Sequence, residues 1–227
     1  ILTSTAFVFA IQMPAVSQAD SEEYEDSNRV VIYFTRHAEK KTELQDFEDG
    51  TFMEICGESK CSEVLNAKGE LRAELLADWF SRRDITERLT HAFSSHKQRT
   101  LQTIELIAAE AGLNDDDDLI LDGVQQLPHD GTELAPESTT PSEAPTIEAL
   151  QNLPGGSVAV VAGHSGTLYD IMEGLGLDTA DEEDYPRNAD GKVRDFGDIW
   201  KVVLKDNGEA RLKYRKNLQP VRLRVVD

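Results

Sequence analysis

Two histidines and two arginines lie in separate segments of the sequence that the fold could bring together around one anion. Arg36 and His37 follow the apolar run VVIYFT, and His164 follows the apolar run VAVVAG. Arg99 lies in the segment SSHKQRTLQT, where a helical pattern begins. Guanidinium groups bind phosphoryl oxygens in bidentate geometry, and a neutral imidazole carries a lone pair that can attack phosphorus. These residue types predict a phosphate site with a histidine nucleophile.

The predicted chemistry needs neither a metal ion nor another cofactor. A phosphoramidate formed on a histidine is labile enough to be hydrolysed in a second step. The arginines would stabilise the charge that develops on the equatorial oxygens of the transferred group. We therefore expect a phosphorylated small molecule or a phosphoprotein as the substrate, and no metal or cofactor in the site.

A largely parallel sheet would bring these residues together. Residues 29–35 and 157–163 are apolar runs of strand length, typical of strands buried on both faces. Ligands of parallel sheets bind outside the carboxyl ends of the strands, so His37 and His164 would lie at one edge. Because strands alternate with helices along the chain, we predict a layered α/β domain with a mostly parallel sheet.

Other periodicities supply the remaining elements. Apolar residues recur at helical spacing in 67–82, which places Leu71 on the inner face of that helix. The pair Asn207-Gly208 predicts a hairpin between two late strands. Further expected features are a helix at 98–111, a helical pattern after His164, strands at 91–95 and 119–122, a surface excursion at 128–145, and core positions for Trp79, Phe80 and Trp200.

The segments TRHAEK, SSHKQRTLQT and VAGHSGT, in this order, resemble the motifs of the histidine phosphatase superfamily, also called the phosphoglycerate mutase-like family. The similarity runs from about Val30 to Tyr214. It implies a phosphoglycerate mutase-like fold, a three-layer α/β sandwich. It also implies that His37 is the phosphorylated nucleophile and that Arg36, Arg99 and His164 complete the phosphate pocket.

Two further positions concern the substrate and its leaving group. His96 lies three residues before Arg99 and is a candidate substrate contact. Members of the family protonate the leaving group with a carboxylic acid, placed either just after the second histidine or in the loop after the third strand. Here Ser165 takes the first of these places. The second contains LPHDGTE, from which we choose Glu133 as the acid, with Asp130 and Glu39 as rival candidates.

The N-terminal residues predict export. Residues 1–19 carry no charge and end in Ser17-Gln18-Ala19, which is typical of a signal peptide cleaved after Ala19. A membrane anchor is the alternative, but the apolar run is short and interrupted. We therefore expect a signal peptide at 1–19, a polar tail at 20–28, and a periplasmic or secreted domain at 29–227, in which Cys56 and Cys61 form a local disulfide.

The overall charge excludes several kinds of partner. The chain has 43 acidic and 23 basic side chains, a formal net charge of -20. This charge repels nucleic acid and anionic membrane surfaces, so an anionic substrate requires a local positive pocket. No segment after the first nineteen residues is long and apolar enough to span a membrane. The sequence carries no signal for an oligomeric state.

The expected function is therefore a metal-independent phosphohydrolase that works through a phosphohistidine. One alternative is a phosphomutase, which must retain its phosphoenzyme and meet a pool of phosphorylated small molecules. The other is a phosphate-binding module that has lost turnover, which the absence of an acid beside His164 favours.

Overall fold

The central pair of strands forms from the two most continuous apolar runs in the sequence. The computed structural model describes residues 28–41, 64–95, 97–113, 124–126 and 144–219. Strand β1 (Val30–Arg36) pairs in parallel with β4 (Val158–Gly163), and Arg36 is aligned with Gly163. His37 and His164 are the next residues of the two strands, so the register confirms that both leave the sheet at the same edge.

The sheet is mixed and has six strands. Besides β1 and β4 these are β2 (His91–Ser94), β3 (Val124–Gln126), β5 (Asp198–Leu204) and β6 (Ala210–Asn217). The strand order is β3-β2-β4-β1-β5-β6. Four neighbouring strands are parallel, whereas β5 runs antiparallel to both β1 and β6. The predicted mostly parallel sheet and late hairpin are therefore confirmed. The predicted strand at 119–122 lies outside the described residues.

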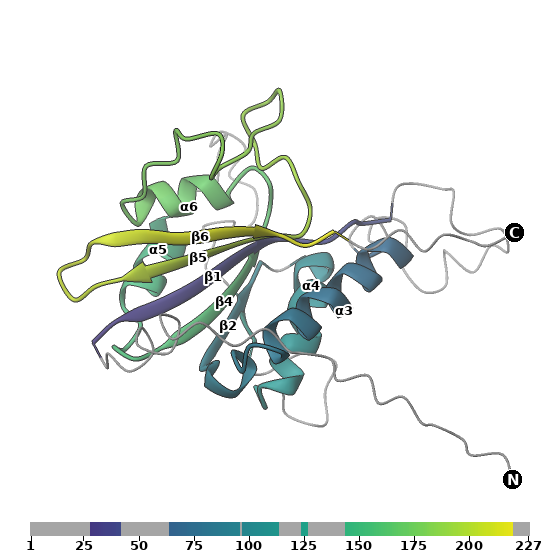
Figure 1. The fold of residues 1–227 in the computed structure, drawn as a ribbon, viewed down its shortest axis with the longest axis horizontal. Coiled ribbons are helices and arrows are strands. Elements are labelled where there is room, and N and C mark those ends of the chain that lie inside the picture. The colour runs from purple at the N-terminus through teal and green to yellow at the C-terminus, as the bar shows by residue number, and fades with distance from the viewer. Residues whose placement is uncertain (1–27, 42–63, 96, 114–123, 127–143, 220–227) are drawn as a thin grey trace, which may run out of the picture.

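Helices cover both faces of the sheet and complete a three-layer α/β sandwich (Figure 1). Helices α3 (Ala67–Ser81) and α4 (Gln98–Glu110) pack on one face, around a cluster that includes Tyr33 and Val160. Helices α5 (Ala144–Gln151) and α6 (Leu168–Gly174) cover the other face, around Phe34 and Trp200. A short 3₁₀ helix, η2 (Thr86–Arg88), precedes β2. Helix α5 was not expected from the sequence.

The first turns of α3 differ from the prediction in one respect. Leu71 is 38% exposed, whereas the neighbouring Arg72 is 1% exposed, so the expectation for Leu71 is wrong. At this end the helix faces the loop after β1 rather than the apolar core, and Arg72 binds the Glu39 carboxylate there. Trp79, Phe80 and Trp200 are buried as predicted.

Several other expectations concern residues outside the described ones. These are the signal peptide, nearly all of the polar tail, and the disulfide between Cys56 and Cys61. Within the described residues, no helix has the length and apolar character needed to cross a membrane.

Candidate active site

His37 is held at the carboxyl end of β1 with a defined tautomer. Its backbone N–H donates to the Gly163 carbonyl (2.9 Å), and its ring Nδ1 lies 2.7 Å from the Ala38 carbonyl oxygen. A carbonyl oxygen only accepts hydrogen bonds, so Nδ1 carries the ring proton. The lone pair of the neutral ring is therefore on Nε2, the nitrogen suited to attack phosphorus.

The surroundings of His37 also keep the ring neutral. Burial, the largest cause, and the positive charges of Arg99, Arg36 and Lys40 together lower its pKa to about 4, against a raising effect of the Ala38 hydrogen bond. A protonated imidazole has no lone pair to attack with. The environment thus favours the nucleophilic form at neutral pH.

Arg36 lies beside His37 and is fixed on two sides. Its Nη1 donates to the carbonyl oxygens of Val193 and Arg194, both at 3.2 Å. Its guanidinium carbon lies 3.9 Å from the centre of the Phe196 ring, a cation–π contact. Among the described residues, no group accepts a hydrogen bond from its buried Nε. This donor suits an anionic ligand.

Arg99 and His164 complete the group. The His164 ring centre lies 5.4 Å from that of His37, with the two planes at 64°. Arg99 lies in the first turn of α4, and its Nη2 is 3.3 Å from His164 Nδ1. Arg36, His37, Arg99 and His164, predicted from three separate motifs, thus lie together at one edge of the sheet.

Thr103 fastens the loop after β1 to α4. Its hydroxyl oxygen accepts from the Ala38 N–H (2.9 Å) and donates to the Arg99 carbonyl (2.6 Å). One buried side chain therefore couples the position of His37 to the helix that carries Arg99.

The three candidate proton donors have different outcomes. Glu39 is 8% exposed and forms two hydrogen bonds with Arg72, at 2.6 and 2.7 Å, and an ion pair with Lys68. Burial raises the pKa of Glu39, but these cationic partners outweigh it and leave the pKa below its usual value. Glu39 is thus held ionised as a structural carboxylate. Glu133, Asp130 and the candidate contact His96 lie outside the described residues.

Two residues near the site were not identified from the sequence. Ser95 lies within the motif SSHKQRTLQT, and its hydroxyl is 2.8 Å from His164 Nε2. Phe196 packs on Arg36 and lies 5.9 Å from the His37 ring centre. Ser95 could have been found through its motif, whereas no local pattern marks Phe196.

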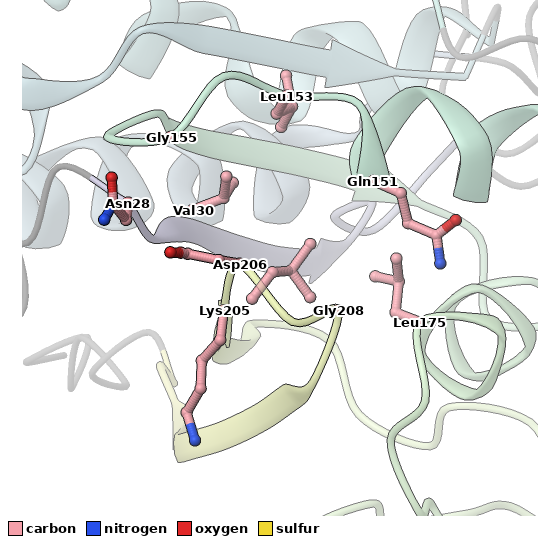
Figure 2. A pocket seen from close by; sticks show the side chains of 10 residues that line it. Asn28, Val30, Gln151, Leu153, Gly155, Leu175, Lys205, Asp206 and Gly208 are labelled. Atoms are coloured by element: carbon pink, nitrogen blue, oxygen red, sulfur yellow. The ribbon is translucent and has the colours of Figure 1, made fainter.

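A separate cavity of about 600 Å³ lies at the opposite end of β1 (Figure 2). Its lining includes Val30, the first residue of β1, Leu204, the last residue of β5, and the hairpin residue Lys205. None of the predicted phosphate-site residues lines it. Within the described part of the chain, no cluster of three or more His, Cys, Asp or Glu side chains is arranged to hold a metal ion.

Comparisons with solved structures agree with this architecture. YhfR of Bacillus stearothermophilus has a TM-score of 0.51 at 16% identity, covering 84% of this chain and 98% of its own. SixA from Agrobacterium tumefaciens has a TM-score of 0.50 at 17% identity, covering 84% and 97%. A mycobacterial glucosyl-3-phosphoglycerate phosphatase has a TM-score of 0.50 at 15% identity, covering 84% and 100%. At these identities the likeness concerns the fold alone.

Sequence comparison finds a family model that matches part of the chain. No curated protein matches the chain. The model of the histidine phosphatase superfamily (branch 1) matches residues 32–122, which include β1, Arg36, His37 and Arg99. His164 follows the parallel partner strand, as the third motif requires. The motifs, the family match over residues 32–122 and the phosphoglycerate mutase-like fold agree with one another, and in these respects the chain is similar to the histidine phosphatase superfamily.

Proposed function

We propose that this protein is a metal-independent phosphohydrolase acting on phosphomonoesters or related phosphorylated compounds. The main support is the state of His37, whose Nδ1 proton is bound by the Ala38 carbonyl while Nε2 keeps its lone pair. Arg36, Arg99 and His164 lie around this nucleophile. In a chain of formal charge -20, two guanidinium groups beside a neutral imidazole suit a phosphoryl group.

The reaction would proceed in two displacements. The Nε2 lone pair of His37 attacks phosphorus, the bond to the leaving oxygen breaks, and an acid protonates that oxygen; we assign this role to Glu133. The deprotonated Glu133 then takes a proton from water, which attacks the phosphohistidine; the P–N bond breaks, and inorganic phosphate leaves. Arg36 and Arg99 would bind the equatorial oxygens, where charge develops in both transition states.

The test is a phosphatase substrate screen combined with detection of an acid-labile, alkali-stable phosphoenzyme. Release of inorganic phosphate with a trapped phosphohistidine supports the proposal. Conversion of a phosphoglycerate into its isomer without free phosphate would favour a mutase. Phosphate binding without turnover on any substrate would favour a binding module.

The location of the enzyme is a separate proposal. Residues 1–19 resemble a signal peptide and support a periplasmic or secreted enzyme. N-terminal sequencing of the exported protein tests this, because cleavage after Ala19 would leave Asp20 as the first residue.

The assignment of Glu133 predicts a dependence on the leaving group. Glu133→Gln should slow an alkyl phosphate by about two orders of magnitude, since general acid catalysis contributes roughly 10² to 10⁴. An aryl phosphate whose phenolate leaves readily should be much less affected. Measuring kcat for both ester types checks this, and equal losses for the two would count against Glu133 as the acid. Glu148→Gln, on α5, is the matched control.

The state of His37 predicts an unusual titration. Its ring should titrate with a midpoint near pH 4 in the folded protein, because burial and neighbouring cations disfavour the charged form. The unfolded chain, with an ordinary value of about 6.5, binds more protons between these two pH values. His37 therefore reduces stability as pH falls through this window. An NMR titration of the ring checks this; a midpoint near 6.5 would contradict it.

The pocket also predicts stabilisation by inorganic phosphate. Saturating phosphate should raise the melting temperature, because a ligand at about 100 times its Kd stabilises the native state by roughly 2.7 kcal/mol. Arg36→Gln should remove most of this shift. Arg82→Gln should retain it, because Arg82 is exposed, directly follows the last residue of α3 and forms an ion pair with Asp78 there. Differential scanning calorimetry with and without phosphate distinguishes these outcomes.

A further inference from the structure

The hydroxyl of Ser95 lies between two partners near the proposed phosphoryl site. Ser95 directly follows β2, and its Oγ is 2.8 Å from His164 Nε2 and 2.7 Å from Thr100 Oγ1. The Lys97 backbone N–H points at the same oxygen, at 3.3 Å. These hydrogen bonds connect Thr100, Ser95 and His164 in a row. The direction of each bond follows from which of its two atoms can donate and which can only accept.

Thr100 sets the direction at one end. Its hydroxyl lies 2.6 Å from the Lys97 carbonyl oxygen and 3.0 Å from the Ser95 carbonyl oxygen. Carbonyl oxygens only accept, so the single hydroxyl proton of Thr100 is donated to them. Thr100 Oγ1 must then accept from Ser95, which leaves Ser95 Oγ as an acceptor toward Lys97 N–H and His164. His164 Nε2 therefore carries a proton.

Arg99 sets the direction at the other end. Its Nη2 lies 3.3 Å from His164 Nδ1, and a guanidinium only donates. His164 Nδ1 must accept, so in the neutral ring the proton is on Nε2. The two ends of the chain of hydrogen bonds therefore require the same tautomer of His164, although they involve different side chains.

We propose that Ser95 is a positioning residue that holds His164 as the Nε2–H tautomer, so that Nδ1 accepts from Arg99 and keeps its guanidinium beside His37. The two histidines then have opposite tautomers. Ala38 holds the proton of His37 on Nδ1, which leaves Nε2 free to attack, while Ser95 holds the proton of His164 on Nε2. The expected effect on turnover rests on the proposed phosphohydrolase function, whereas the tautomer does not.

Loss of the Ser95 hydroxyl should release this arrangement. In Ser95→Ala the Nε2 proton of His164 loses the acceptor that Ser95 provides, and the Nδ1–H tautomer becomes accessible. His164 Nδ1–H and the Arg99 guanidinium are both hydrogen-bond donors. Because they cannot bind each other, the guanidinium would move away from its position beside His37. A lost hydrogen bond of about 0.5–1.5 kcal/mol corresponds to roughly a two- to tenfold loss of phosphate affinity and of kcat/KM.

The first measurement is the tautomer itself, by ¹⁵N–¹H NMR of histidine-labelled full-length protein at a pH where His164 is neutral. Wild-type protein should show the Nε2–H form of His164. Ser95→Ala should show a mixture or the Nδ1–H form, and Ser95→Thr, which keeps a hydroxyl, should restore the wild-type pattern. Ser94→Ala is the matched control, because the Ser94 hydroxyl donates to the Ser95 carbonyl oxygen (2.8 Å) instead of contacting the His164 ring.

The second measurement is binding of inorganic phosphate and turnover of an aryl phosphate by the same variants. Weaker binding and lower kcat/KM in Ser95→Ala, with values near wild type in Ser95→Thr and Ser94→Ala, support the proposal. Thr100→Val tests the same arrangement with Ser95 still present. It removes the acceptor of the Ser95 hydroxyl proton, so that Ser95 can donate to His164 Nε2. The tautomer of His164 should then also shift toward Nδ1–H.

The outcomes separate this proposal from the proposed function. An Nδ1–H tautomer in wild-type protein, or an unchanged tautomer in Ser95→Ala, overturns the role of Ser95 whether or not the protein hydrolyses phosphate esters. A shifted tautomer and weaker phosphate binding without turnover in wild-type protein would support Ser95 and reject the phosphohydrolase. Turnover in wild-type protein with unchanged kcat/KM in Ser95→Ala would support the phosphohydrolase and reject the role of Ser95.

Discussion

Replacing His37 with alanine should lower the turnover of an aryl phosphate by at least about a thousandfold, the scale seen when a catalytic nucleophile is removed. Alanine has no lone pair to attack phosphorus, so no phosphoenzyme can form at this position. Arg36, Arg99 and His164 would remain, and inorganic phosphate should still bind. Steady-state kinetics, with acid-labile phosphate counted on the protein, check both parts.

His91→Ala is the matched control for this prediction. His91 is the first residue of β2, is partly buried, and stacks on Phe93 with ring centres 6.0 Å apart, away from the two site histidines on the sheet. Its loss should affect stability at most modestly and should leave the phosphoenzyme signal in place. Turnover in His37→Ala at the wild-type level would reject the phosphohistidine mechanism, since no other group is assigned the role of nucleophile.

Replacing Arg72 with methionine should lower the free energy of unfolding by about 3–5 kcal/mol, the cost of breaking a buried ion pair from one side. Arg72 is 1% exposed and its partner Glu39 is 8% exposed. The variant would leave the Glu39 carboxylate buried, with the exposed Lys68 as its remaining ion-pair partner among the described residues. Urea unfolding followed by circular dichroism measures the loss.

A second substitution tests the cause of that loss. Adding Glu39→Gln to Arg72→Met removes the unpaired charge and should recover part of the stability, because the buried charge carries much of the cost. The exposed pair of Arg82 and Asp78 on α3 is the control, and Arg82→Met should change stability by no more than about 1 kcal/mol. If Arg72→Met behaved like Arg82→Met, the ion pair would not hold the loop after His37.

Arg72 also links the two sides of the site. Its Nη1 donates to the Leu218 carbonyl (2.5 Å), and Leu218 N–H donates to the Gly197 carbonyl (2.8 Å). Gly197 has a φ of +79°, and a Cβ there would meet both Leu218 O and Arg72 Nη1. The residue before it, Phe196, packs on Arg36. One buried guanidinium therefore connects the loop after His37 with the turn that places Phe196.

Much of the site could be predicted because it depends on strand ends. The apolar runs before His37 and His164 are unambiguous, and parallel pairing of two buried strands brings their carboxyl ends together. Arg99 followed from its place at the start of a helix with clear periodicity. The layered fold and the late hairpin were predicted on the same basis, from apolar period and turn residues.

The contacts that orient these residues are made between side chains far apart in the sequence, and hydrophobic periodicity carries no information about such contacts. Arg72 and Glu39 are 33 residues apart, Ser95 and His164 are 69 apart, and Arg36 meets the carbonyl of Val193 across 157 residues. The same periodicity placed Leu71 inward, although the neighbouring Arg72 is the buried residue. The pattern of apolar residues in the sequence therefore predicts which residues come together at the site. Which nitrogen of each histidine carries the proton depends on hydrogen-bond partners that meet only when the loops between the elements have packed.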